Sequence, residues 1–216
     1  MQKPVRKFSP RFRAPKYVST MSMKLKSISL GQHASVLASR DTGRTIGAAL
    51  ADALRESSLL LDFTGVEVVT PPFLDEVLRA VHGSLSRQEP TRVLIVSGLN
   101  EDVRETLAIV LERAHMMLGS LDEDQLELLG GPEHLRTTLT EAASLGHPFD
   151  APAIAERLKL KLPNVNARLT ALVKAGVLVR ERDPHAGRGI KYTYDVPSPE
   201  DIAETEDLTR LVAAIS

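Results

Sequence analysis

The sequence predicts an α/β domain with a mixed sheet, followed by a smaller α+β domain near the C-terminus. Between residues 24 and 117, short apolar runs suited to strands alternate with amphipathic segments suited to helices, a pattern typical of helices packed on a sheet. Between residues 150 and 175, two short helical patterns are separated by a tight turn. Between residues 177 and 196, polar and apolar residues alternate in two runs, which predicts an antiparallel pair of strands.

The composition is that of a folded protein, since 43% of the 216 residues are hydrophobic and 25% are charged. The absence of cysteine excludes disulfides, thiolate metal sites and cysteine nucleophiles. No apolar run approaches the roughly 20 residues that span a bilayer, and the basic N-terminus lacks the apolar segment of a signal peptide. We therefore expect a cytoplasmic protein with no membrane partner.

Charge is distributed in blocks along the chain. Residues 1–26 carry eight basic residues and no acid, residues 60–145 carry fifteen acids against six arginines, and residues 150–197 carry nine basic residues against five acids. Basic parts around an acidic centre suit a protein that touches nucleic acid through some parts only. Residues 1–22 are rich in proline and basic residues and predict a basic disordered arm, which either adds phosphate contacts or is a solvated tail.

The α/β domain is expected over residues 23–118. Its strands follow from period-two alternation or short apolar runs, and its helices from apolar stripes with capping residues at their starts. The expected elements are strands at 24–30 and 34–39, a helix from Asp41 or Thr42, a strand at 57–63, an extended run at 66–69, a helix from Thr70, a strand at 92–96 and a helix at 101–116 capped by Asn100.

Three further segments complete the predicted organisation. Residues 119–131 are expected to form an acidic connector with helical character (LDEDQLELL). The second domain is expected over residues 132–197 and begins with a helix from Pro132 to Ala143. Residues 198–216 are expected to form an acidic C-terminal helix, because Ser198 is a suitable N-cap for the acidic turn that follows.

The second domain contains a tightly spaced pair of helices. Asp150 caps a short helix that ends near Leu158, and the following helix has Pro163 in its first turn. Gly176 stands where helices commonly end in glycine. Residues 178–182 and 190–196 then form a hairpin around the loop 183–189 (DPHAGRG). The buried side of the second helix is expected to consist of Val165, Leu169, Leu172 and Val173.

This order of elements resembles the winged helix-turn-helix family of bacterial regulators. The resemblance implies double-stranded DNA as partner, a homodimer on two-fold sites, and a second helix that enters the major groove. On that basis Asn164 pairs with adenine and Arg168 with guanine or phosphate, while Lys161 and Asn166 contact phosphates. The hairpin adds charge through Arg182, His185, Arg188 and Lys191. The alternative is a winged helix used only for protein contacts.

The segment SSLLLDFTGVEVVTPPFLDEVLRAV resembles the STAS fold of anti-sigma-factor antagonists, and its F-x-D-E helix start (Phe73, Asp75, Glu76) resembles the STAS-like variant family. The resemblance implies a protein-contact surface, which we expect at Thr70, Phe73, Asp75 and Glu76. Antagonists carry a phosphorylatable Ser or Thr where this chain has Pro72. Switching by phosphorylation at that position is therefore not expected.

No pattern predicts catalysis. The adjacent acids Asp75 and Glu76 suit the first turn of a helix, the six histidines lack metal-ligand spacing, and no phosphate-binding glycine loop is present. We therefore expect no enzymatic activity, cofactor or metal. The favoured hypothesis is a DNA-binding transcriptional regulator. The alternative is a partner-switching protein, similar to anti-sigma-factor antagonists, that acts through protein contacts.

Overall fold

A six-stranded mixed sheet organises the computed structural model of the protein, which describes residues 23–85, 91–122, 125–145, 148–182 and 191–213. The strand order is β11-β1-β3-β5-β6-β7, and every neighbouring pair is parallel except β6 and β7. The strands are β1 (Leu25–Ser29), β3 (Ser58–Asp62), β5 (Leu94–Ser97), β6 (Met117–Asp122), β7 (Gln125–Gly130) and β11 (Ile202–Asp207). The expected arm at residues 1–22 lies outside the described residues.

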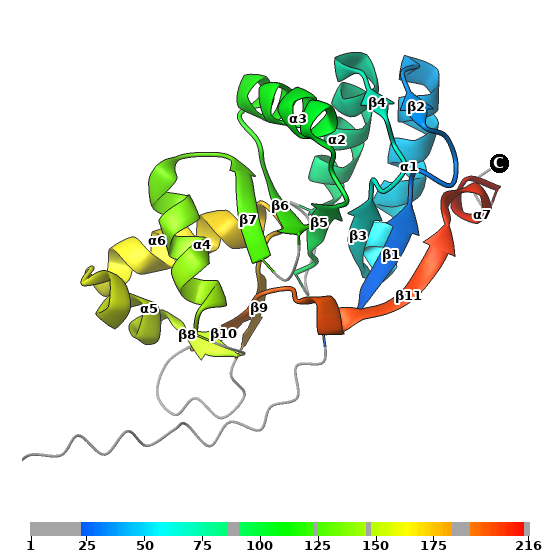
Figure 1. The fold of residues 1–216 in the computed structure, drawn as a ribbon. Coiled ribbons are helices and arrows are strands. Elements are labelled where there is room, and N and C mark those ends of the chain that lie inside the picture. The colour runs from blue at the N-terminus through cyan, green and yellow to red at the C-terminus, as the bar shows by residue number, and fades with distance from the viewer. Residues whose placement is uncertain (1–22, 86–90, 123–124, 146–147, 183–190, 214–216) are drawn as a thin grey trace, which may run out of the picture.

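Three helices connect the parallel strands and cover one face of this sheet (Figure 1). They are α1 (Arg40–Glu56), α2 (Pro71–Leu85) and α3 (Glu101–Ala114). The chain steps from β1 to β3, β5 and β6 in one direction, and right-handed crossovers then place every connecting helix on the same side. A short parallel pair, β2 (Val36–Leu37) and β4 (Val68–Val69), lies beside them.

The opposite face of the sheet is covered by the segment from α4 to β10, residues 133–195, which we call the α4–β10 unit. It contains α4 (Glu133–Ala143), β8 (Phe149–Asp150), α5 (Ala151–Leu158), α6 (Leu162–Lys174), β9 (Val179–Arg182) and β10 (Tyr192–Asp195). One continuous core joins it to the sheet. The sheet contributes Leu25, Leu60, Ile95, Leu121 and Leu126, and the unit contributes Leu135, Leu139, Leu169, Leu172 and Val177.

Hydrogen bonds across this boundary join the two parts further. The backbone N–H of Leu94 donates to the carbonyl of Gly176 at 2.8 Å. The backbone N–H of Arg180 donates to Thr91 Oγ1 at 2.8 Å, and that hydroxyl donates to the Arg180 carbonyl at 3.2 Å. A parallel sheet is normally buried on both faces, and here the α4–β10 unit supplies the second cover.

The expected acidic connector at 119–131 is wrong, because these residues form most of the hairpin of β6 and β7. Alternate leucines of the hairpin, including Leu121, Leu126 and Leu128, are buried under the α4–β10 unit. Asp122 and Glu127 lie toward solvent, where Arg104 forms ion pairs with Asp122 and, at 3.4 Å, with Glu127. The expected domain boundary at residue 118 therefore falls inside a strand.

The expected C-terminal helix at 198–216 is also wrong over most of its described length. Ser198 does begin a helical turn, since its N–H and hydroxyl both bond to Asp201 Oδ2, but that 3-10 helix spans only Pro199–Asp201. The chain then forms β11 along the edge of β1, where Lys26 pairs with Glu206. A short helix, α7 (Leu208–Ala213), follows and buries Leu208 on the α1 side.

The starts of the three helices α1, α2 and α3 are held by different side-chain hydrogen bonds. Ser39, rather than Asp41 or Thr42, caps α1 by accepting from the backbone N–H groups of both of those residues. Asn100 caps α3 as predicted, since its side chain accepts from the N–H of Val103 at 2.8 Å. The Thr70 hydroxyl donates to the Ala38 carbonyl at 2.8 Å, so it joins α2 to the strand segment before α1.

Candidate nucleic-acid interface

The helix pair α5 and α6 is held in a fixed geometry by local signals in the sequence. Asp150 caps α5 by accepting from the N–H of Ala153 at 3.0 Å. The helix ends at Leu158, and its C-cap residue Lys159 has a left-handed φ of 52° that turns the chain toward α6. Lys161 occupies the N-cap position of α6, and the four predicted apolar residues of α6 are all buried. The buried side of α6 is therefore the predicted one.

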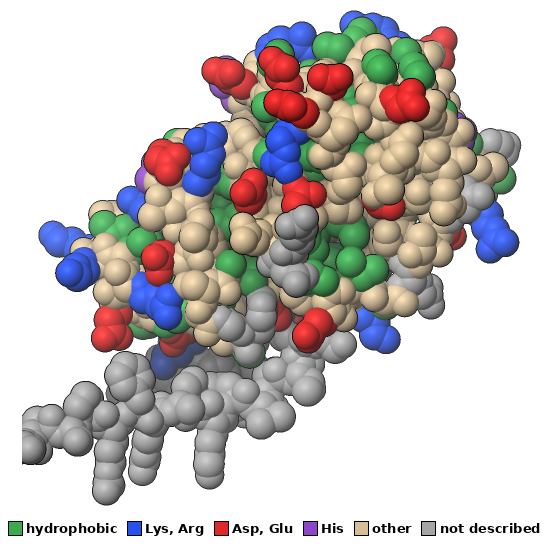
Figure 2. Space-filling view, viewed as in Figure 1, with side chains coloured by type: hydrophobic (Ala, Val, Ile, Leu, Met, Phe, Trp, Pro, Cys, Tyr) green, Lys and Arg blue, Asp and Glu red, His purple; other side chains and the backbone are tan. Residues whose placement is uncertain are grey.

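The outward side of α6 carries amides, small side chains and lysines. Asn164, Asn166 and Ala167 are exposed, and Lys161 and Lys174 lie exposed at the two ends of the helix. No acid occurs between Leu162 and Lys174. Figure 2 shows Lys and Arg side chains at the end of the molecule formed by the α5–α6 turn, whereas acidic side chains gather over the region of α3. The outward side of α6 can thus approach a negatively charged surface.

Arg168 departs from its predicted role. It lies on the flank of α6 that packs against α4, and its Nη1 donates to the His134 carbonyl at 3.2 Å and to Thr138 Oγ1 at 3.3 Å. Thr138 is fully buried. Arg168 thus joins α6 to α4, and the expectation that it contacts guanine or phosphate does not fit this geometry.

A three-stranded sheet in the order β8-β10-β9 lies beside α6. Its register places Tyr192 opposite Arg182 and Tyr194 opposite Arg180. A pocket of about 410 Å³ separates this sheet from the flank of α6 and brings Asn166 and Lys191 to the same hollow. Of the predicted hairpin residues, Arg182 and Lys191 are exposed, whereas His185 and Arg188 lie outside the described residues.

Arg180, Tyr192 and Tyr194 also line this hollow, and none of them was predicted from the sequence as a site residue. Arg180 lines it with its guanidinium carbon 4.6 Å from the centre of the Tyr192 ring, a cation–π contact. Residues two apart in a strand lie on the same face, so Arg180 lies on the face of β9 that carries the predicted Arg182. This alternation in the sequence could have identified Arg180. Behind them, Tyr194 stacks on Phe149 with ring centres 5.8 Å apart, and burial raises the pKa of its phenol, while Arg180 acts in the opposite direction.

The predicted partner-binding residues at the start of α2 are mostly engaged within the chain. Phe73 is 1% exposed and belongs to the core under α1 and α2, so its predicted role as a partner contact is wrong. Asp75 pairs with Arg113 at 2.5 Å. Glu76, whose side chain is 11% exposed, pairs with Arg40 at 3.2 Å and lies near two further arginines of α1 and α2.

Close to this helix start, the β2–β4 pair exposes two valines. Val36 and Val68 are register partners on the two strands and are 52% and 47% exposed. Thr70 and Pro71 follow the end of β4 in the sequence, and Pro71 is exposed. Because Phe73 is buried, Val36 and Val68 are the large apolar side chains that the described residues expose near the predicted partner site. Sequence reasoning missed them because each strand contains only two residues.

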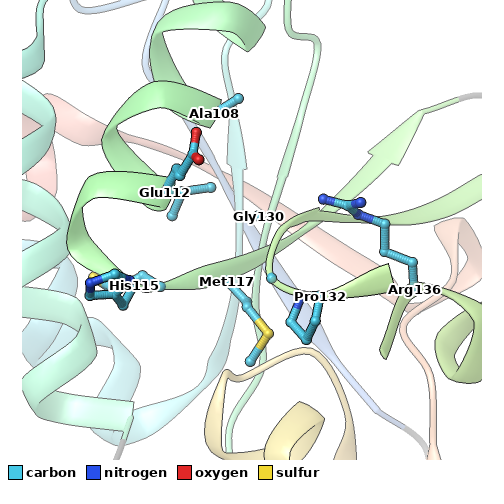
Figure 3. Close-up of a pocket in the computed structure, with 10 residues that line it drawn as sticks. Ala108, Glu112, His115, Met117, Gly130, Pro132 and Arg136 are labelled. Carbon is cyan, nitrogen blue, oxygen red and sulfur yellow. The ribbon is translucent and has the colours of Figure 1, made fainter. Parts of the chain in front are cut away.

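A second pocket, of about 530 Å³, lies where α3, the β6–β7 hairpin and α4 meet (Figure 3). Glu112 of α3 and Arg136 of α4 stand on opposite walls, with Met117 and Pro132 between them. Arg136 also pairs with Glu133 at 3.2 Å. The described lining contains no Ser, Thr, Lys or Tyr, and its ionisable side chains are those of Glu112, His115 and Arg136.

The described residues form neither a metal-binding cluster nor a membrane-spanning helix. No group of three or more His, Cys, Asp or Glu side chains is placed to hold a metal ion there. None of the helices in that part of the chain is long and apolar enough to cross a membrane.

Comparison with known families gives one match. Residues 48–104 match the family described as a STAS-like domain of unknown function (DUF4325). The matched stretch runs from α1 through β3 and α2 to the first turn of α3, and so lies within the part expected to be STAS-like. No curated protein and no solved structure matches the chain. The protein therefore contains a STAS-like region in a mixed α/β fold, and such a region fits a regulatory role.

Proposed function

We propose that the protein is a regulator that binds double-stranded DNA through the α4–β10 unit, which we interpret as a winged helix-turn-helix. The order α4, β8, α5, α6, β9, β10, with a sheet ordered β8-β10-β9, supports this interpretation. In such domains the second helix of the pair enters the major groove and the hairpin lies beside it. Here those elements are α6 and the β9–β10 hairpin.

The observation that carries the proposal is the chemistry of the outward side of α6. Exposed amides and a small side chain lie in the first two turns of a helix that carries no acid, lysines stand at its two ends, and Arg180, Arg182 and Lys191 lie on the adjacent hairpin. A helix of this width fits the major groove, and cations on both sides suit the two phosphate backbones. Binding of this kind needs no catalytic step or cofactor and takes place in the cytoplasm.

We further propose that the protein acts as a homodimer, because symmetric dimers match two-fold DNA sites. Within such a dimer the two α6 helices would occupy half-sites about one helical turn apart. The STAS-like region would then serve protein contacts or sensing.

Salt dependence of DNA binding by the full chain tests this function. The affinity for a random duplex should fall steeply with salt, because each neutralised phosphate adds about −0.9 to the slope of log K against log salt. Lys161→Ala and Lys191→Ala should each reduce that slope by about one. Arg55→Ala is the matched control, since Arg55 lies exposed in α1 on the other face of the sheet. Absence of binding at low salt would overturn the proposal.

A second candidate function, partner switching through protein contacts, is favoured by the exposed pair Val36 and Val68. Neighbouring exposed apolar residues commonly mark interaction surfaces, and the STAS-like match at 48–104 fits this role. If this function is the principal one, Val68→Lys should abolish a specific protein complex identified by cross-linking and mass spectrometry. In that case the chain should also fail to bind duplex DNA at low salt.

A further inference from the structure

The position of Arg168 restricts what α6 can recognise. With Arg168 bonded to α4, the exposed residues of the helix are Leu162, Pro163, Asn164, Asn166, Ala167 and Lys174. Neither a guanidinium nor a carboxylate points outward from α6. The side-chain amide of Asn164 makes no hydrogen bond to the rest of the described chain, so it is available to an outside partner.

The base pairs of DNA differ in the side chains that they accept in the major groove. Guanine is bound by bidentate Arg or by Lys, and the exocyclic amine of cytosine donates to Asp or Glu. Adenine is bound by bidentate Asn or Gln, and the methyl group of thymine packs against Ala or the methyl of Thr. The first two turns of α6 therefore present outward the groups that suit adenine and thymine and lack those that suit guanine and cytosine best.

The lysines of α6 do not change this conclusion. Base edges are contacted mainly by the N-terminal residues of such a helix, and Lys174 lies ten residues beyond Asn164, about 15 Å along the axis. Lys161 precedes the first helical residue, where phosphate contacts are expected. Both lysines therefore suit the backbone of DNA better than its base edges.

Resting on the proposed function, we infer that α6 selects adjacent A·T base pairs: Asn164 binds adenine, and the methyl of Ala167 packs against the thymine methyl of a neighbouring pair. Residues three apart on a helix lie on one face about 4.5 Å apart along the axis, close to the spacing of about 3.4 Å between stacked base pairs. One turn of α6 thus spans two neighbouring pairs.

Binding experiments on the full chain with chemically altered duplexes test this inference. A site is first selected from random duplexes, and its affinity is measured by fluorescence anisotropy at fixed salt. We expect adjacent A·T pairs in each half-site. Replacing the thymines of those pairs by deoxyuridine, which removes only the methyl group, should weaken binding by the parent chain. Replacing adenine by 7-deazaadenine removes the N7 acceptor and keeps the exocyclic amine, so the loss of one hydrogen bond should weaken binding by about 2- to 13-fold per half-site.

Two variants assign these effects to residues. Asn164→Ala should bind the adenine and 7-deazaadenine duplexes equally. Ala167→Gly should bind the thymine and deoxyuridine duplexes equally, whereas Ala171→Gly, the matched control for glycine in the same helix, should keep the preference for thymine. Circular dichroism checks that each variant is folded.

The outcomes separate the inference from the function on which it rests. Selected sites with G·C at these positions, or equal binding of the thymine and deoxyuridine duplexes by the parent chain, would overturn the A·T inference while leaving DNA binding intact. Failure to bind any duplex at low salt would overturn the proposed function and this inference together.

Discussion

Gly119 offers a test of whether the sheet and the α4–β10 unit form one folding unit. It lies in β6 on the face toward that unit. A Cβ added there would lie 2.8 Å from Ile95 Cγ2 and 3.4 Å from both Leu126 Cδ1 and Val177 Cγ1. Ile95 belongs to the sheet and Val177 to the α4–β10 unit. The substitution Gly119→Ala therefore overpacks the boundary between the two parts.

The expected change in stability follows from these distances. Carbon atoms pack best at about 3.5–4.0 Å, so Ile95 must move by about 1 Å to admit the added methyl group. Overpacking of this size costs about 1–3 kcal/mol. Loss of glycine's freedom in the unfolded chain offsets about 0.5–1 kcal/mol of it. Gly119→Ala should thus lower the free energy of unfolding by about 0.5–2 kcal/mol.

Gly83→Ala is the matched control for this variant. Gly83 lies in α2, and an added Cβ there meets no atom within 4 Å, so the change should stabilise by about 0.5–1 kcal/mol. Since 1 kcal/mol shifts Tm by about 2–4 °C in a chain of this size, the two variants should melt several degrees apart. Circular dichroism should show a single transition for each. Equal stability of the variants, or two separate transitions with only one affected, would contradict a shared core.

Three further predictions concern the buried Tyr194, the hydrogen bonds of Arg168 and the C-terminal strand β11. Burial raises the pKa of Tyr194 above its ordinary value of 10.0, so the unfolded chain loses this proton first. The resulting stability is complete below about pH 10 and is lost as pH rises through the folded pKa; urea unfolding should show this alkaline slope, and Tyr194→Phe should reduce it. Arg168→Ala should destabilise the chain by about 1–3 kcal/mol, because it removes two hydrogen bonds and leaves the buried Thr138 hydroxyl with fewer partners; a changed base preference with unchanged Tm would contradict its role as a brace. A chain ended at Asp201 loses β11 and the fully buried Leu208, so it should lose at least about 2 kcal/mol in urea titrations; unchanged stability would show that this edge strand adds nothing.

The strands and helices between β1 and α3 were predictable from local pattern. Leu59 and Leu61 face the helices while Leu60 faces the α4–β10 unit, so the run of apolar residues in β3 correctly indicates a strand buried on both sides. The stripe of α6 was likewise predictable, because a helix that is apolar along one side can pack in only one orientation.

The hairpin of β6 and β7 was not predictable in the same way. The acids of LDEDQLELL suggest an exposed connector when the segment is considered alone. The alternation of its leucines favours a strand only because β5 is a neighbouring strand for β6 and the α4–β10 unit buries the leucines. β11 is a similar case, since its acidic residues form a strand because the edge of β1 is open to pair with them.

Some features of the candidate interface likewise depend on local sequence, and others depend on contacts between distant parts of the chain. The sequence by itself determined the exposed amide of Asn164, the buried stripe of α6 and the glycine that ends it, because these depend on neighbours within a turn or two of one helix. Only the tertiary structure decided that Arg168 turns to α4, that Phe73 lies in the core, and that the α4–β10 unit closes the second face of the sheet. Those outcomes depend on which surfaces meet, and contacts between residues far apart in the chain leave no periodic trace in the local sequence.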